Sequence, residues 1–271
     1  MERISSRQNP LVRRFRDLAA ATAGEDVLLD GEHLLREALA SHVPIEVAAF
    51  SDVRAAASAG ADSSLPSDVL RQGGRVVSVS AAVLDAMSPV REPSGVAAIA
   101  TLRHQSLDAA LARAPQLIFL LSGIQDPGNV GAIVRAGEAC GVTGVVAGEG
   151  TADPYGWKAL RGSMGSAFRV PIAARVPLLD AVRAAKASGV RLVAAVPRDG
   201  EPLPEIDLRA PSAILLGGEG AGLPEPLLRL ADTRVTIPMC PPVESLNVAV
   251  AAALIVYEAF RQRRRSEKAR P

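Results

Sequence analysis

Short apolar runs recur through the second half of the chain, and each run stops at residues that favour turns. Four to eight apolar residues between turn residues are typical of a strand that is buried on both faces. Segments of helical length separate these runs. The predicted strands are 117–121, 142–146, 190–196, 213–216 and 234–237, and the predicted helices are 130–140, 155–163, 178–187, 224–230 and 246–265. Regular strand–helix alternation predicts an α/β fold, in which a parallel sheet carries helices on both faces.

The first hundred residues alternate in the same way, but less regularly. The predicted strands there are 27–29, 45–50, 75–79 and 96–100, and helices are predicted after Asn9-Pro10 and at 32–39 and 81–87. Residues 55–68 predict a loop with a weak helix. We therefore predict a small N-terminal α/β domain at residues 1–105, a linker at 106–115 and a second domain at 116–271.

Length and composition agree with two domains inside a cell. A chain of 271 residues exceeds a typical single domain, and 48% hydrophobic residues suffice for a buried core. Cys140 and Cys240 are too few for a disulfide framework, so we expect a reducing, cytoplasmic location. No apolar run reaches the roughly 18 residues that span a membrane. The three histidines lack the spacing of metal ligands, so we expect no metal site.

Positive charge gathers at the two ends of the chain, although the formal net charge is only +1. Arg3, Arg7, Arg13, Arg14 and Arg16 make the first sixteen residues basic. They form either a solvated helix face or an arm that contacts phosphate, to which arginine is well suited. The same alternatives apply to the C-terminal run, which consists of Arg261, Arg263, Arg264, Arg265, Lys268 and Arg270.

A first polar segment follows the strand at 117–121. Asp126-Pro127-Gly128 predicts a turn, and Asn129 then stands where a helix N-cap would. Arg135, six residues later, lies about 120° away around a regular helix. The two side chains can converge only if Asn129 lies in the turn before the helix. The alternative is an ordinary N-cap and a surface arginine, with Glu138 as its helical partner.

Two further polar segments follow the strands at 213–216 and 234–237. In the first, glycines surround Glu219 and allow a close approach of backbone to a ligand. In the second, two prolines precede Ser245 and Asn247 at the expected start of the last helix. Loops at the carboxyl ends of neighbouring strands are where α/β sheets bind ligands. Glu219 could instead be a solvated carboxylate, and Ser245 a simple N-cap.

These three segments together resemble the three motifs of a known enzyme class. Asp-Pro-Gly-Asn-Val-Gly-Ala-Ile-Val-Arg (126–135), Leu-Gly-Gly-Glu-Gly-Ala-Gly-Leu (216–223), and Ile-Pro-Met followed by Glu-Ser-Leu-Asn-Val-Ala-Val (237–250) occur in the order typical of that class. The class is the SpoU group of RNA ribose 2′-O-methyltransferases, in the SPOUT superfamily. Residues 161–165 resemble the Arg-x-Ser-x-Gly stretch between its first two motifs, and residues 1–105 more weakly resemble its L30e-like substrate-binding domain.

The resemblance implies a C-terminal trefoil knot, S-adenosylmethionine as methyl donor, and a homodimer with the site beside the interface. It also implies RNA as substrate, with ribosomal RNA favoured over transfer RNA. The implied donor contacts are Gly217, Ile237 and Leu246, and the implied reaction centre is Asn129, Arg135, Glu219, Ser245 and Asn247. Our candidates for contact with RNA are Arg7, Arg13, Arg161 and Ser163, and Trp157 is either a base-stacking or a core residue.

The implied chemistry needs an activated ribose hydroxyl, and the resemblance gives this role to Arg135. Because a guanidinium stays protonated, Arg135 activates the hydroxyl alone or together with a substrate phosphate. Two other functions remain open. A dinucleotide oxidoreductase would need its Gly-x-Gly-x-x-Gly after the first strand, whereas the glycines here follow a late strand. A catalytically silent RNA-binding protein is the second alternative, and the intact polar residues argue against it.

Overall fold

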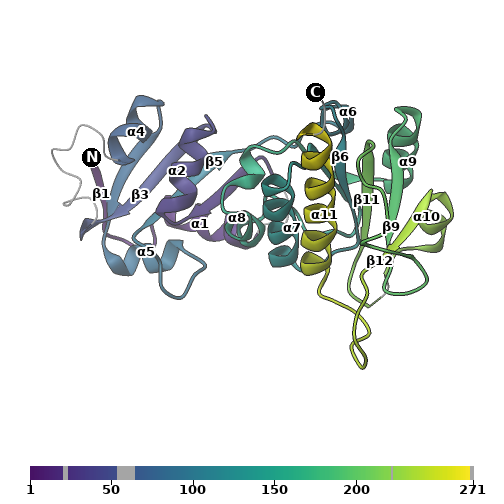
Figure 1. The fold of residues 1–271 in the computed structure, drawn as a ribbon. Helices are drawn as coiled ribbons and strands as arrows, with labels where there is room; N and C mark the ends of the chain where they lie inside the picture. Colours follow the sequence, from purple (N-terminus) through teal and green to yellow (C-terminus); the bar gives the residue numbers. More distant parts are fainter. Residues whose placement is uncertain (21–23, 54–64, 221, 269–271) are drawn as a thin grey trace. The chain divides into compact units, whose positions relative to one another are not determined.

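The computed structural model describes residues 1–20, 24–53, 65–220 and 222–268, and it forms two compact units (Figure 1). The first unit comprises Met1–Arg103 and Tyr155–Arg169, and the second comprises His104–Pro154 and Val170–Pro271. Most of the predicted loop at 55–68 lies outside the described residues. Its end carries a helix, α4 (Leu65–Arg71).

These boundaries differ from the predicted ones in two places. Tyr155–Arg169 belongs to the first unit, because Trp157 packs against that unit's core and donates its indole N–H to the carbonyl of Ala19 at 3.1 Å. The predicted linker carries a helix, α6 (Leu107–Leu111), in the second unit. Ala110 is fully buried in the core of that unit, which explains why the segment is ordered there.

The first unit contains a mixed five-stranded sheet with the strand order β1-β4-β3-β5-β2. Its strands are β1 (Glu2–Ile4), β2 (Asp26–Asp30), β3 (Ile45–Ser51), β4 (Arg75–Val79) and β5 (Val96–Thr101). Its other helices are α1 (Pro10–Ala20), α2 (Glu32–Ala40), α5 (Ala81–Met87) and α8 (Trp157–Ser163). Strand β5 is antiparallel to β2 and β3, whereas β1, β4 and β3 are parallel. Phe15 of α1 and Met87 of α5 pack into one core on this sheet.

The second unit contains a seven-stranded sheet with the order β10-β12-β9-β11-β6-β7-β8, and every pairing is parallel. Its strands are β6 (Leu117–Ser122), β7 (Gly144–Gly148), β8 (Ile172–Val176), β9 (Arg191–Ala195), β10 (Glu201–Pro202), β11 (Ser212–Gly217) and β12 (Thr233–Thr236). Its helices are α6, α7 (Pro127–Ala139), α9 (Leu178–Ala187), α10 (Glu225–Leu230) and α11 (Val248–Lys268). The parallel α/β prediction is confirmed, and the predicted knot stays a prediction.

Helices cover both faces of this sheet, as predicted. Leu120 and Leu215 lie on the face that packs against α6, α9 and α10. Phe119 points to the opposite face, where α7 approaches so closely that a Cβ on Gly137 would lie 2.8 Å from its ring. Helix α11 packs beside α7 (Figure 1). Successive side chains of each strand therefore enter different cores, which explains why the strands are almost continuously apolar.

Strand β11 lies between β9 and β6, so the chain reverses its direction of travel across the sheet at this point. The strands β12, β9, β11 and β6 all end at the same edge, because they are parallel. Ligands of α/β sheets bind at such an edge, beside the point where the strand order reverses. The three predicted polar segments all begin here.

Candidate functional site

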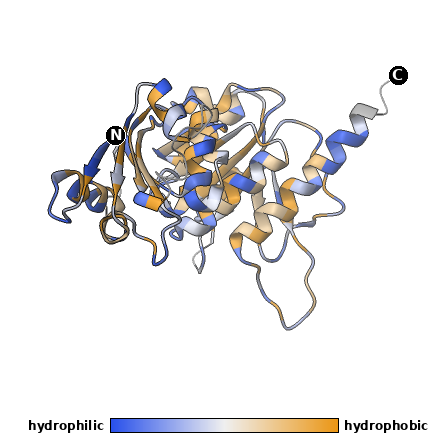
Figure 2. Cartoon of the chain, turned by 90° about the vertical axis from the view of Figure 1, so that its left-hand side faces the viewer, coloured by the Kyte–Doolittle hydropathy of each residue, from blue (hydrophilic) through white to orange (hydrophobic). Residues whose placement is uncertain are grey.

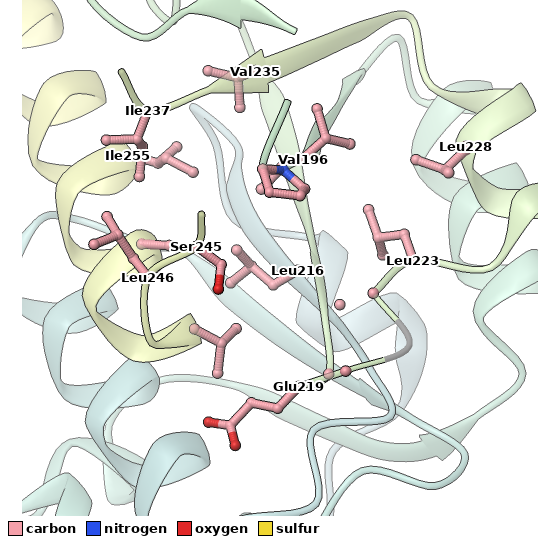
Figure 3. A pocket seen from close by; sticks show the side chains of 18 of the residues that line it. Val196, Leu216, Glu219, Leu223, Leu228, Val235, Ile237, Ser245, Leu246 and Ile255 are labelled. Atoms are coloured by element: carbon pink, nitrogen blue, oxygen red, sulfur yellow. The ribbon is translucent and has the colours of Figure 1, made fainter. Parts of the chain in front are cut away.

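A cavity of about 520 Å³ lies at the carboxyl ends of β9, β11 and β12 (Figure 3). Its walls consist of residues 195–197 after β9, 216–220 and 222–223 around the end of β11, 235–239 around the end of β12, and 245–255 at the start of α11, together with Leu228 of α10. Most lining side chains are apolar, and Glu219 is the lining carboxylate. A mostly apolar cavity of a few hundred Å³ with few polar groups is typical of a small-molecule site. The wall after β9 was missed by sequence reasoning, since Val-Pro carries no polar signal.

Two glycines let the loop after β11 fold tightly. A Cβ on Gly217 would lie 2.4 Å from the carbonyl carbon of Gly222, and one on Gly218 would lie 2.1 Å from the carbonyl oxygen of Gly123. Both contacts are with backbone, so no side-chain rotation could relieve them. The backbone of Gly218 also donates to the carbonyl of Ser122 at 2.8 Å. The loops after β6 and β11 are thus held together at the cavity.

Three polar side chains from the three predicted segments meet beside the cavity. Asn129 donates from Nδ2 to Oε1 of Glu219 at 2.7 Å. Asn247 donates from Nδ2 to Oδ1 of Asn129 at 3.0 Å and to Oε1 of Glu219 at 3.4 Å. The carboxylate accepts both amides through one oxygen, which leaves Oε2 available to a ligand. We call these three residues the polar triad.

Asn247 is oriented by the helix that follows it. Its Oδ1 accepts from the backbone N–H of Ala249 at 2.9 Å and of Val250 at 3.3 Å, as an N-cap does. With the oxygen committed to the helix, the amide N–H₂ must point toward Glu219. The alternative in which Ser245 is a simple N-cap is not observed, because α11 begins at Val248 and Asn247 occupies the cap position.

Asn129 lies inside α7 and is not its N-cap. Asp126 caps the helix by accepting from the backbone N–H of Gly128 at 2.6 Å, and Pro127 occupies the first turn, where its missing N–H costs nothing. Asn129 and Arg135 are therefore both helical and lie on different sides of α7. This excludes the convergence within one chain that an N-capping Asn129 would have allowed.

Arg135 is exposed, and among the described residues it forms no hydrogen bond or ion pair. The alternative reading, a helical ion pair with Glu138, is thus not observed. The buried face of α7 consists of Val130, Gly131, Ile133, Val134 and Gly137. Arg135 is also absent from the cavity wall. The structure leaves its guanidinium available to a partner outside the described chain.

The predicted donor contacts all lie in the wall of the cavity. Gly217, Ile237 and Leu246 all line the cavity, together with Glu219 and Ser245 (Figure 3). Asn129 and Asn247 join this group through Glu219. Of the predicted reaction centre, only Arg135 is not brought to the cavity.

The RNA-contact candidates all lie in the first unit. Arg7, Arg13 and Arg161 are exposed, and Arg7 is steadied by donation from Nε to the carbonyl of Ala82 at 2.9 Å. Ser163 is fully buried, and its hydroxyl donates to the carbonyl of Leu160 at 2.9 Å. The prediction that Ser163 contacts RNA is therefore wrong for this structure, since the hydroxyl is occupied within its own helix.

Two other candidates have structural roles. Trp157 is half-buried and packs against the core of the first unit, which favours the core interpretation. Arg263 of the basic tail donates to the carbonyls of Leu208, Gln116 and Ala210 at 2.7–3.0 Å, and burial lowers its pKa. Arg270 lies outside the described residues. The described part of the chain contains no cluster of metal-binding side chains and no helix that could span a membrane.

The family model for the SpoU rRNA methylase family matches residues 116–257, the region that carries the cavity and the polar triad. The chain belongs to this family. This chain is 33% identical over 260 residues to the 23S rRNA (guanosine(2553)-2′-O)-methyltransferase RlmP of Bacillus subtilis. The aligned region covers 95% of this chain and 98% of the relative.

Solved structures agree with this family assignment over nearly the whole chain. An AdoMet-bound rRNA methyltransferase from Sinorhizobium meliloti superposes with a TM-score of 0.83 at 28% identity, covering 96% of this chain and 97% of that one. The SpoU methyltransferase AviRb from Streptomyces viridochromogenes, in complex with AdoMet, gives a TM-score of 0.76 at 28% identity, covering 92% and 97%. The likeness to these solved structures thus extends over residues of both units.

Proposed function

We propose that this SpoU protein methylates a ribose 2′-hydroxyl of RNA, with S-adenosylmethionine as the methyl donor and ribosomal RNA as the substrate. The observation that carries the proposal is the polar triad at the wall of a cavity formed by the three SpoU motifs. The RlmP relative is named as a 23S rRNA 2′-O-methyltransferase, and the two solved neighbours contain AdoMet.

The cavity fits the donor in size and chemistry. Its volume of about 520 Å³ lies in the range of small-molecule sites. Leu216, Ile237 and Leu246 offer apolar surface to an adenosine, and backbone at Gly217 and Gly218 can approach it without a Cβ. Glu219 offers a negative charge to the positive end of the donor. When bound, S-adenosylmethionine supplies a methyl group on a positively charged sulfur.

Arg135 activates the ribose in this proposal. A guanidinium is always protonated, so Arg135 stabilises negative charge that develops on the 2′-oxygen, while the proton leaves to water or to a substrate phosphate. Its lack of a partner within the described chain supports this role, because no ion pair has to break before the substrate binds. Glu219 accepts both amides through Oε1, which leaves its second oxygen available at the cavity wall.

We test the function first by donor binding. Calorimetry should show binding of S-adenosylmethionine and its demethylated product, and no binding of NAD. Arg135→Ala and Arg135→Lys should retain donor binding and lose at least about a hundredfold in turnover, the scale of one positioned acid–base group. Absence of donor binding, with or without RNA, would refute the proposed activity. Wild-type turnover by Arg135→Lys would withdraw the role of Arg135 alone.

The substrate is tested in the cell. Mapping of 2′-O-methyl groups in RNA from a strain lacking the gene should show one site lost from ribosomal RNA and restored by the wild-type gene. Loss of a 2′-O-methyl site from transfer RNA would instead identify transfer RNA as the substrate. No loss from any RNA would favour the silent RNA-binding protein. We also propose a cytoplasmic location, which cell fractionation tests, because two free cysteines suit a reducing compartment.

In our proposal the first unit binds the RNA through Arg7, Arg13 and Arg161. Deletion of residues 1–103 is a poor test, because α8 belongs to that unit and would lose its core. Arg7→Ala with Arg13→Ala should weaken RNA binding and leave donor binding unchanged. Arg71→Ala is a matched control, since Arg71 is an exposed arginine of the same unit that pairs with Asp68. Equal RNA affinity for the double variant and the control would exclude this reading.

We further propose a homodimer through α11. Val250, Leu254 and Tyr257 are 49%, 43% and 59% exposed, and their spacing of four and three residues places them on one face. Figure 2 shows the hydrophobic first half of this helix and its hydrophilic end. An exposed apolar stripe of this kind marks an interface. Light scattering should give a dimer mass at micromolar concentration, and Leu254→Glu should give a monomer. A monomeric wild type would refute the proposal.

A further inference from the structure

The loop between β12 and α11 carries part of the cavity wall, and its residues 238–246, before the anchored Asn247, are weakly attached to the second unit. Residues 240–247 are all exposed, and the loop extends away from the sheet in Figure 1. Its one internal backbone hydrogen bond among the described residues joins Val243 N–H to the carbonyl of Cys240 at 3.2 Å. Ser245 and Leu246 nevertheless line the cavity, so the position of this loop decides the shape of that wall.

A single ion pair connects this loop to a neighbouring one. Nη2 of Arg198 lies 2.8 Å from Oε1 of Glu244. Among the described residues, this pair is the one side-chain hydrogen bond between residues 238–246 and another segment. Arg198 directly follows Pro197, and Glu244 directly precedes Ser245, and both of these neighbours line the cavity. The pair thus connects the wall after β9 with the wall before α11.

The two partners differ in how firmly they are held. The loop of Arg198 is fixed by Thr236, whose hydroxyl donates to the carbonyl of Val196 at 3.2 Å and accepts from the N–H of Gly200 at 2.9 Å. No comparable contact fixes Glu244 among the described residues. Arg198 therefore provides a fixed point on one wall, and Glu244 attaches the looser wall to it.

We propose that Arg198 and Glu244 are positioning residues that form an ionic clasp across the donor cavity. The clasp holds Ser245 and Leu246 against the bound donor and slows its release. This inference rests on the proposed donor, and it adds a salt-dependent contribution to donor affinity that the apolar wall alone would not give.

The expected effect is modest, because the side chains are 66% and 79% exposed. Exposed ion pairs contribute little, so loss of the clasp should weaken donor binding by about two- to fivefold. The effect should also fade at about 1 M salt, where the screening length falls to roughly 3 Å.

The test is a double-mutant cycle on donor affinity. Dissociation constants and dissociation rates for S-adenosylmethionine are measured for wild type, Arg198→Ala, Glu244→Ala, the double alanine variant and the charge-reversed pair Arg198→Glu with Glu244→Arg. Arg183→Ala is the matched control, since it breaks an exposed pair with Asp180 on α9, outside the cavity wall.

The clasp predicts equal weakening by either alanine variant, no further loss in the double variant, and at least partial recovery with the charges reversed. The loss should appear in faster dissociation and vanish at high salt, and the control should bind like wild type. Weakening by Arg198→Ala alone, without recovery on reversal, would mean that Arg198 contacts the donor itself, and would overturn the clasp. Wild-type affinity in all variants would overturn it as well. A wild-type protein that binds no donor would instead refute the proposed function.

Discussion

Asn247→Asp is a sharp test of the polar triad, because it changes the contacts of the amide nitrogen with Glu219 and Asn129 and preserves the helix cap. Aspartate is as good an N-cap as asparagine, so α11 should keep its cap. The amide that donates to Oε1 of Glu219 at 3.4 Å becomes a carboxylate oxygen. A favourable contact is therefore replaced by repulsion between two negative charges.

The separation sets the size of this repulsion. Two unit charges 3.4 Å apart repel by about 1 kcal/mol in water and by about 5 kcal/mol at an effective dielectric constant of about 20. Because Glu219 is exposed, we expect a value toward the lower end, about 2 kcal/mol with the lost hydrogen bonds to Glu219 and Asn129 included. For a chain of this size, that lowers the melting temperature by roughly 4–8 °C.

The pH dependence of the variant's stability shows whether repulsion between the two carboxylates causes the destabilisation. At about pH 8 both carboxylates of the variant are charged, and the destabilisation is complete. As the pH falls toward about 5, the pair takes up a proton that the unfolded chain binds less readily, and the difference from wild type shrinks. Thermal unfolding of both proteins from about pH 5 to 8 measures this trend.

Two controls separate repulsion from loss of the cap. Asn247→Ser keeps a cap oxygen without a charge, so it should cost under about 1 kcal/mol at every pH. Glu219→Gln combined with Asn247→Asp removes the repulsion and should recover most of the stability at about pH 8. A variant Asn247→Asp that unfolds like wild type at about pH 8 would refute the geometry of the triad.

Three further outcomes follow from burial and close packing. Cys240 is exposed, whereas Cys140 is half-buried and burial raises the pKa of its thiol, so a thiol reagent at about pH 7 should modify Cys240 faster than Cys140; equal rates would contradict this. Burial raises the pKa of Asp30, so its charge costs stability at neutral pH, and Asp30→Asn should raise the melting temperature at about pH 7 but not at about pH 3. Gly218→Ala would place Cβ 2.1 Å from the carbonyl oxygen of Gly123, so donor binding should fall at least tenfold by calorimetry, on the order expected for a backbone shift of about 1 Å. Unchanged binding would show that the loops are not in contact.

The sequence by itself determined the architecture of the second unit, because continuous apolar runs indicate strands that are buried on both faces of the sheet. Strand β11, predicted at 213–216, spans Ser212–Gly217, and helix α9 was predicted with its observed bounds. The missed strands β8 and β10 lack that signal. Strand β8 contains Arg175 in a left-handed conformation, with φ of 58°, and β10 has only two residues. A long apolar run identifies its own strand, whereas a short or irregular one forms only beside a neighbour.

The motifs also identified the polar residues of the site, since glycines around a carboxylate and an amide before an apolar helix are local features. Their contacts were decided by the tertiary structure. Asn129 and Glu219 are 90 residues apart in sequence and meet only because β6 and β11 are adjacent and parallel. Cap positions also depended on the tertiary structure: Asp126 caps α7 in the place expected for Asn129, and Asn247 caps α11 where Ser245 was one alternative.

The division into units is the part that only the tertiary structure decided. Residues 155–163 read locally as one more helix of the strand–helix alternation, and they do form α8. Nothing in that pattern says which core receives Trp157, because an amphipathic helix can bury the same side chains against any apolar surface. The indole N–H donates to the carbonyl of Ala19, which lies 138 residues away in sequence. Periodicity fixes which face of an element is buried, and only the folded chain supplies the surface that buries it.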